Sequence, residues 1–310
     1  MRHLASLAVG ALMTSLCASG CGTEVAQSTN LPYQDFYETI QAHMMAFSQT
    51  EMKDGNWDLD FGDAAYYGPA FFVGAGLKYG RDDYLDIGLM GVEHDKAVLD
   101  RALSDLGYFM NDLEEVLMAA FALVETMAMT GDMDGIEKLD EVLDLVNTTA
   151  DGFGTYIEAD IPSYALNTYG NTTVTASIAL LNLRYAELLN TPLSPDRQAF
   201  GLKVIGATDA KVWSGTEYRF KPGVDKLYLY PNVTMILSNA TAYILTGEEK
   251  YREKCRAIHA GIQPLKDPVK KCYRSPYSAE FMGAQTDEYS TLSIHNFTLM
   301  GLALMHGITG

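Results

Sequence analysis

The sequence is poor in cysteine and in positive charge. Its four cysteines include no CxxC pair and no Cys/His cluster, which excludes a zinc-ribbon type of site. Basic residues number 22 against 40 acidic ones, a formal net charge of −18, so the average field would repel nucleic acid. P-loop, GxGxxG, GxSxG and HExxH motifs are missing too. We therefore expect no nucleic-acid partner, no metal and no cofactor.

The composition is that of an ordinary globular protein. Of 310 residues, 48% are hydrophobic and 20% are charged, so the chain can bury a sizeable core and is not disordered. Length alone allows one large domain or two small ones.

The first twenty residues have the pattern of an export signal. Arg2 precedes an apolar stretch, residues 4–16, that is too short to span a membrane. The tetrad at 18–21 (Ala-Ser-Gly-Cys) resembles a bacterial lipobox, although that family usually has Leu where Ala18 stands. The resemblance implies a signal peptide at 1–20, a lipid on Cys21, a tether to residue 30 and a membrane-anchored protein of the bacterial cell envelope. Plain secretion, or a periplasmic location, is the alternative.

The export signal changes how the cysteines are counted. Cys17 leaves with the signal and Cys21 takes the lipid, so that Cys255 and Cys272 remain. Two cysteines in an exported chain most simply form a disulfide, here between Cys255 and Cys272.

Long stretches without any charged residue alternate with charged amphipathic ones. The charge-free stretches contain proline and asparagine, which favours helices buried inside a globular protein over membrane spans. The expected buried helices lie in 64–79, 113–130, 161–183, 227–247 and 289–310. The expected amphipathic helices lie in 34–52, 81–101, 132–146, 196–211 and 251–263. Tight turns at Gly80, Gly131, Asn190 and Gly247 recur every 51 to 59 residues, a period typical of helical hairpins.

This alternation resembles the α/α toroid of the six-hairpin glycosidase superfamily and of related polysaccharide lyases. The resemblance covers residues 31–310 as a single domain and implies an all-α fold with an inner and an outer ring of helices. About ten helices give five hairpins rather than six, so the ring is open or smaller. An open α-solenoid is the alternative.

Long connections from outer to inner helices would gather at one end of such a ring. They carry many aromatic residues, whose faces stack on sugar rings, and we expect Trp57, Trp213 and Tyr230 to line a pocket there. Packing of these rings onto the helices is the alternative. The same connections carry Arg219 and Arg274, which could bind the carboxylate of an acidic sugar or could simply be solvated.

Acidic residues stand where these connections enter the inner helices. Glycoside hydrolysis needs two carboxylates, one protonated and one ionised. We expect Asp112 or Glu115 to be the acid, Asp287 the opposing carboxylate, and His295 to lie below them. Acids in a first helical turn also stabilise the helix by themselves, and His295 could equally be a hydrogen-bonded core residue.

These observations favour a cell-envelope lipoprotein that processes glycans, most simply a glycoside hydrolase. The alternatives are a non-catalytic lipoprotein that binds glycans or a protein partner, and a polyuronate lyase. Such lyases use His with Tyr and Asn, and the pair His295-Asn296 is the part of that pattern present here.

Overall fold

A computed structural model describes residues 52–53, 56–57, 63–152, 172–223, 227–266, 273 and 292–309. Two short antiparallel strands come first, β1 (Met52–Lys53) and β2 (Asn56–Trp57), with Met52 opposite Trp57. All other regular structure in the described ranges is helical, which confirms the predicted all-α class. None of the described helices is long and apolar enough to cross a membrane.

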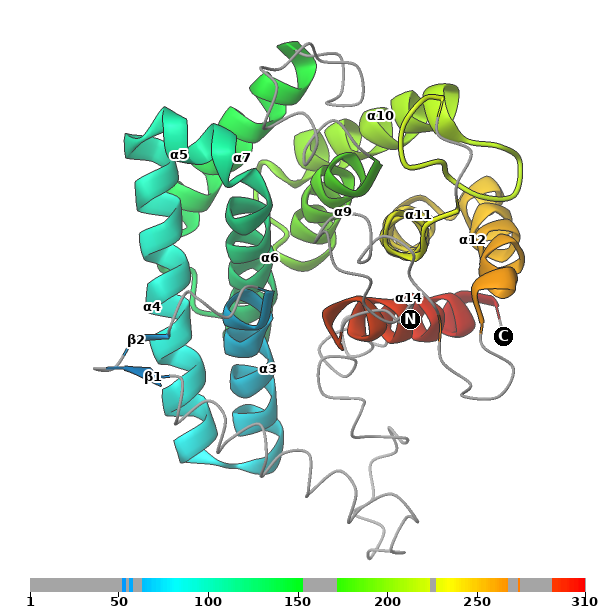
Figure 1. Ribbon diagram of the computed structural model, residues 1–310. Helices are drawn as coiled ribbons and strands as arrows, with labels where there is room; N and C mark the ends of the chain where they lie inside the picture. Colours follow the sequence, from blue (N-terminus) through cyan, green and yellow to red (C-terminus); the bar gives the residue numbers. More distant parts are fainter. Residues whose placement is uncertain are drawn as a thin grey trace, which may run out of the picture.

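Five helices form an inner layer. Each contacts the next in chain order, so that they follow an arc (Figure 1). They are α3 (Asp63–Tyr79), α6 (Leu113–Thr130), α9 (Thr172–Leu188), α11 (Leu229–Thr246) and α14 (Leu292–Thr309). In α11 every residue from Leu229 to Ala242 is buried, although several of them are polar. The charge-free stretches therefore mark the interior, as predicted.

Four helices cover the outside of the arc. They are α4 (Asp82–Ser104), α7 (Ile136–Gly152), α10 (Ser194–Val212) and α12 (Glu249–Ile262). In α12 only Tyr251, Cys255, Ile258 and Ile262 are buried, which gives the single apolar face predicted for an outer helix. A short helix, α5 (Leu106–Asn111), links α4 to α6, and a 3-10 turn, η3 (Gln263–Leu265), follows α12.

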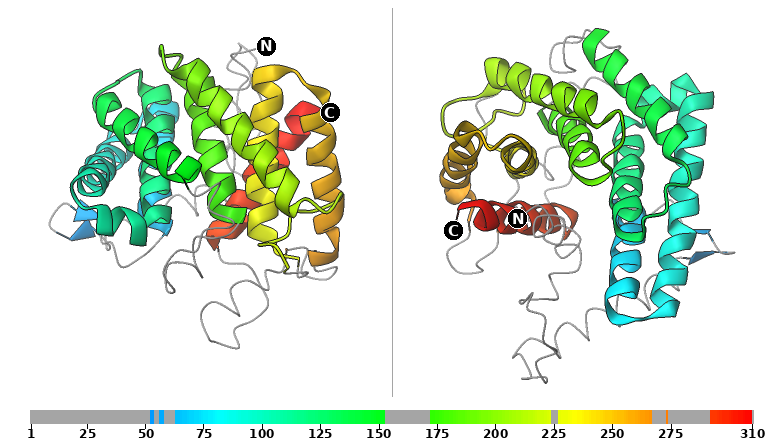
Figure 2. Two further views of the ribbon diagram at one scale, coloured as in Figure 1. Left: turned by 90° about the horizontal axis from the view of Figure 1, so that it is seen from above. Right: turned by 180° about the vertical axis from the view of Figure 1, so that it is seen from behind.

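Tight turns join inner helices to outer ones as expected. Gly80, Gly131 and Gly247 have φ values of 62°, 73° and 69°, the left-handed conformation that glycine adopts without strain. The helices do not share one direction, since α6 lies in the plane of Figure 1 while α11 is seen nearly end-on. Figure 2 shows α11 from the side, next to α10 and α12. The expectation of an open or smaller ring is not tested, because residues 34–51 of the predicted helix in 34–52 lie outside the described residues.

The chain packs as two sets of helices, α3 to α7 and α9 to α14, that meet mainly where α6 contacts α9. A buried arginine crosses this contact. Arg184 of α9 donates from Nε and Nη2 to the two carboxylate oxygens of Glu125 of α6, at 2.8 and 3.0 Å. Its Nη1 donates to Glu187 at 2.5 Å, and the Arg184 side chain is 1% exposed. The two sets of helices are thus joined by a desolvated, bidentate ion pair.

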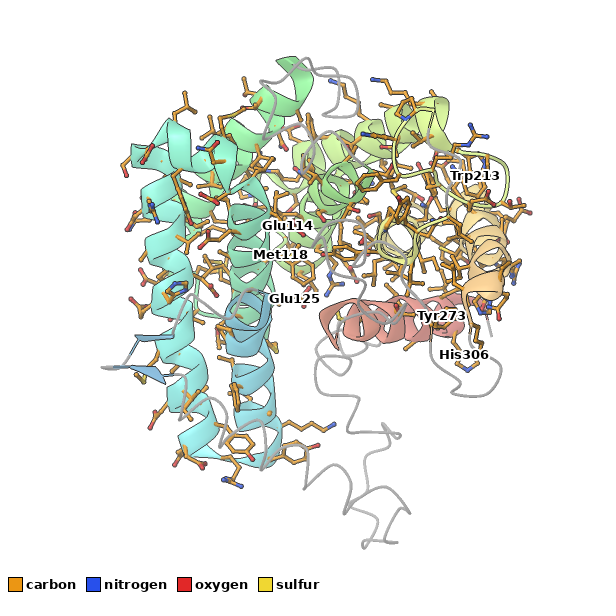
Figure 3. All side chains as sticks on the ribbon, in the orientation of Figure 1. Glu114, Met118, Glu125, Trp213, Tyr273 and His306 are labelled. Atoms are coloured by element: carbon orange, nitrogen blue, oxygen red, sulfur yellow. The ribbon has the colours of Figure 1, made fainter. Side chains whose placement is uncertain are left out.

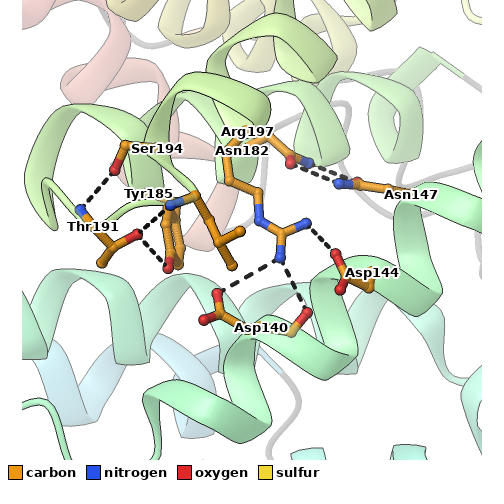
Figure 4. A network of polar contacts seen from close by, with 9 residues as sticks. Asp140, Asp144, Asn147, Asn182, Tyr185, Thr191, Ser194 and Arg197 are labelled. Atoms are coloured by element: carbon orange, nitrogen blue, oxygen red, sulfur yellow. Dashed lines mark hydrogen bonds and ion pairs between the residues drawn. The ribbon is translucent and has the colours of Figure 1, made fainter.

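A second polar network joins the same two sets of helices at α7 (Figure 4). Arg197 of α10 donates to Asp144 at 2.6 Å and to the carbonyl oxygen of Asp140 at 3.2 Å. Nearby, the amides of Asn147 and Asn182 exchange two hydrogen bonds of 2.9 Å. Both contacts are specific in direction, so they fix how α7 lies on α9 and α10.

The predicted disulfide between Cys255 and Cys272 is not found. Cys255 is a free thiol on the apolar face of α12, and its Sγ donates to the carbonyl oxygen of Ile236 in α11 at 3.5 Å. Burial raises the pKa of this thiol to about 12. Because the face that packs on α11 also carries the cysteine, Cys255 behaves as a small core residue; Cys272 lies outside the described residues.

Arg184→Met should destabilise the fold strongly. The change keeps the length of the side chain but leaves the carboxylates of Glu125 and Glu187 buried without their partner, which costs about 3–5 kcal/mol. Urea unfolding followed by circular dichroism measures the loss. Arg252→Met, which removes an ion pair from the surface of α12, is the matched control and should leave the urea midpoint nearly unchanged.

If Arg184→Met loses stability because buried carboxylates are left unpaired, replacing Glu125 and Glu187 by Met in the same protein should restore much of that stability. An Arg184→Met protein as stable as the wild type would show that the pair does not join the two sets of helices.

Candidate functional site

The predicted acids lie at a corner where the chain passes from α4 through α5 into α6. Asp105 ends α4 and caps α5, since its Oδ1 accepts from the Tyr108 backbone N–H at 3.0 Å. Asp112 ends α5 and precedes α6, and Glu115 lies in the first turn of α6. Two closely spaced helix breaks therefore bring side chains from three helices together, which we call the corner cluster: His94, Arg101, Tyr108, Asp112 and Glu115.

Tyr108 is the centre of the corner cluster. Its ring is buried, and the Arg101 guanidinium lies 3.9 Å from the ring centroid, a cation–π contact. Burial, followed by the influence of the nearby Glu115 carboxyl, raises the pKa of Tyr108. Tyr108 therefore stays protonated at neutral pH and its hydroxyl is a hydrogen-bond donor on the side of Glu115.

The two carboxylates of the cluster have different surroundings. Asp112 is exposed in part, yet partial burial of its carboxyl, followed by the charge of Glu115, raises its pKa, while Arg101 acts against the shift. Glu115 is half-buried and lies near Tyr108. A carboxyl with a raised pKa next to a second carboxyl is an arrangement typical of sites that transfer protons.

His94 of α4 adds a titratable group on the other side of Glu115. Its side chain is 12% exposed, and burial lowers the pKa of the imidazole, although the charge of Glu115 acts in the opposite direction. The ring is therefore neutral at physiological pH and available as a proton acceptor.

The three acids at the start of α6, Asp112, Glu114 and Glu115, point in different directions. Successive residues of a helix are turned by about 100°. Glu114 therefore shares one side of α6 with Met118 and Glu125, and Glu115 lies on another side. Figure 3 shows these three side chains along that side, and Glu125 pairs with Arg184 of α9. Asp112 and Glu115 lie on the side of α4 and α5, at the rim between the inner and the outer layer. Sequence reasoning missed the inward position of Glu114, which helical periodicity could have revealed.

The aromatic and basic residues predicted to bind substrate are less concentrated than expected. Trp213 packs on Tyr218, with ring centroids 4.7 Å apart, and has Lys254 of α12 at 5.5 Å (Figure 3). Tyr230 is buried in the first turn of α11. These placements match the alternative in which the rings pack the connections onto the helices.

Arg219 is exposed in the connection between α10 and α11, which several hydrogen bonds hold in place. The Thr172 side chain, at the start of α9, donates to the carbonyl oxygens of Arg219 and Phe220 at 2.5 and 2.9 Å. Asn232 binds both the N–H and the C=O of Tyr218, at 2.7 and 3.0 Å. The connection is thus held rigidly by the N-termini of α9 and α11, with the Arg219 side chain reaching solvent.

Other predicted site residues lie outside the described part of the chain. They are Cys21, Arg274 and Asp287, together with the side chains of Trp57 in β2 and His295 in α14. The pairing of Asp112 or Glu115 with Asp287 therefore stays a prediction. Among the described residues no group of three or more His, Cys, Asp or Glu side chains could hold a metal ion.

The structure is similar to the solved structure of a sugar epimerase, whereas the sequence alone gives no match. No protein-family model matches the sequence, and no curated protein matches it either. A sugar epimerase from a ruminal bacterium superposes with a TM-score of 0.66 at 14% identity, covering 99% of this chain and 87% of the epimerase chain. At this identity the likeness shows a shared fold.

Glu115→Gln should lower the pKa of Asp112, because the charge of Glu115 is one of the two causes that raise it. Carboxyl ¹³C NMR, assigned by comparison with Asp112→Asn, measures the titration. Glu114→Gln is the matched control, one residue away on another side of α6, and should have the smaller effect. An equal effect of both changes would contradict the placement of Glu115 beside Asp112.

Proposed function

We propose that the protein processes a sugar at the corner cluster, and that the reaction is hydrolysis of a glycosidic bond. The observation that carries the proposal is the pair Asp112 and Glu115, in which the Asp112 carboxyl has a raised pKa and Glu115 lies beside both Asp112 and Tyr108. Hydrolysis of a glycoside requires a division of roles between two carboxyl groups. The fold shared with a sugar epimerase supports a sugar as the substrate.

In this proposal Asp112 is the proton donor. It lies at the solvent-exposed end of the pair, so a glycosidic oxygen can reach it, and its raised pKa keeps a larger fraction of the carboxyl protonated near neutral pH. Glu115 is the second carboxyl of the pair, and the protonated hydroxyl of Tyr108 lies near it. Glu115 then acts on the sugar carbon, as base through a water molecule or as nucleophile. Arg101 is stacked on Tyr108, and its positive charge offsets part of the negative charge of the two acids.

Epimerisation is a second candidate, favoured by the name of the similar structure. Inverting a carbon next to a carbonyl requires a base that removes a proton and an acid that returns one. The same pair, with the neutral His94 nearby, supplies groups of both kinds. The two reactions differ in their products, since hydrolysis releases a new reducing end and epimerisation changes the configuration of one carbon without cleavage.

A panel of neutral and uronic-acid oligosaccharides tests the proposal, with binding followed by calorimetry and products by ¹H NMR. We expect turnover by the wild type, and a loss of about 10²–10⁴-fold in kcat for Asp112→Asn and for Glu115→Gln. Glu114→Gln is the control and should change the rate by less than about threefold. All three variants must unfold at similar urea concentrations for the comparison to hold.

The other outcomes are equally informative. Loss of turnover in Glu114→Gln alone would move the chemistry to the inner side of α6 and overturn the assignment. Binding without any product would support the non-catalytic alternative, a glycan-binding lipoprotein. No binding by any sugar would reject a carbohydrate function and favour a protein partner.

We also propose that Cys21 carries a lipid that anchors the protein at the cell envelope, on the resemblance of residues 18–21 to a lipobox. Cys21→Ser should move the full-length protein from the membrane fraction to the soluble fraction of the expressing bacterium, as measured by immunoblot. Cys255→Ser is the control and should leave the distribution unchanged. Membrane association that persists in Cys21→Ser would contradict the proposal.

A further inference from the structure

One acidic side chain in the described part of the chain is buried completely and lacks a hydrogen bond. Asp95, on the core-facing side of α4, is 0% exposed, and neither of its carboxylate oxygens accepts a hydrogen bond from any described residue. A titratable neighbour is His94, whose Nδ1 lies 3.7 Å from Oδ1 of Asp95. This distance is too long for a hydrogen bond but short enough to become one after a small rotation of either side chain.

Burying a carboxyl group in this position without a hydrogen bond destabilises the fold. An unpaired buried polar group costs about 1–3 kcal/mol, and an ionised one costs more. Burial raises the pKa of Asp95 well above its ordinary value, so the group carries its proton at neutral pH. A protonated carboxyl is a hydrogen-bond donor, and the neighbouring imidazole is neutral and offers an acceptor nitrogen.

We propose that Asp95 and His94 share one proton. In the exchange the O–H bond of Asp95 breaks and an N–H bond forms on Nδ1 of His94, while the electron pair stays on the Asp95 carboxylate. The pair keeps the same total charge, so nothing else has to enter the core. When His94 holds the proton, it carries a positive charge that attracts the carboxylate of Glu115, a residue of the proposed site.

The neighbouring charges do not compete for this proton. On α4 itself Lys96 pairs with Glu93 and with Asp134, and Asp100 pairs with Lys138 of α7. On α5 and α6 the titratable groups are Tyr108, Asp112 and Glu115, and on the described side chains of α3 they are Lys78 and Tyr79, at its far end. Of these, Glu115 is the group that acts on the pKa of His94.

The test is the titration of His94 by ¹⁵N NMR of the imidazole, in the full chain without any ligand. In the wild type the shared proton should keep His94 partly protonated to a pH about one unit higher than in Asp95→Asn, because two coupled groups titrate as a pair. Asp86→Asn, an exposed acid on the same helix, is the control and should leave the curve unchanged. Identical curves in the wild type and in Asp95→Asn would overturn the proposal.

A second measurement keeps the proposal falsifiable if Asp95→Asn folds poorly. Asp95→Leu also removes the carboxyl without adding an unpaired polar group, and the same shift of the His94 titration is expected. A merely structural Asp95 would change the urea midpoint in these variants but not the titration of His94. The role at Glu115 rests on the proposed function, whereas proton sharing is measured without a sugar, so the two can fail separately.

Discussion

The arrangement of the whole molecule depends on one buried contact, the pairing of Arg184 with Glu125. The helices on each side of it pack among themselves, and the two sets meet mainly at α6 and α9. Apolar contact alone would let two helices slide or rotate at modest cost, since packed surfaces tolerate several crossing angles. A bidentate guanidinium–carboxylate contact has one geometry, and Arg197 with Asp144 repeats the restriction at α7. These buried charges are costly to desolvate, and what they contribute is a fixed relative orientation of the helices.

The same helices carry more buried charge than the fold needs. Arg184 has two carboxylate partners for one positive charge, and burial raises the pKa of Glu187 although Arg184 opposes the shift. On α4, neither carboxylate oxygen of Asp95 has a hydrogen-bond partner among the described residues. Replacing buried ionic or polar groups by apolar residues is often neutral or stabilising, so groups retained without full pairing need another explanation. At the corner cluster, Asp112 has a raised pKa, which is typical of sites that transfer protons.

Much of the fold could be predicted from the sequence, and the limits have a physical cause. Absence of charge from residues 161–183 and 227–247 indicates burial on all sides, so most of α9 and the whole of α11 could be recognised as inner helices, and Gly80, Gly131 and Gly247 marked three of the tight turns. Cys255 was predicted wrongly because counting cysteines says nothing about which face of α12 carries them. The candidate site was harder to predict from the sequence than the fold. Asp112, Glu114 and Glu115 all fit the start of a helix; helical periodicity puts Glu114 and Glu115 on different sides of α6, and packing shows which side meets α4 and which faces α9.

The different sides of α6 on which neighbouring acids lie limit what a shared fold can say about function. At 14% identity the likeness to a sugar epimerase constrains the paths of the helices but few of the side chains on them. One residue along α6 turns a carboxylate by about 100°, from the side of Tyr108 to the side of Arg184. A reaction therefore has to be argued from the faces of individual helices. In this protein that face is the rim between α4 and α6, where the helix breaks at Asp105 and Asp112 bring two carboxyl groups, one of them exposed, next to a buried tyrosine.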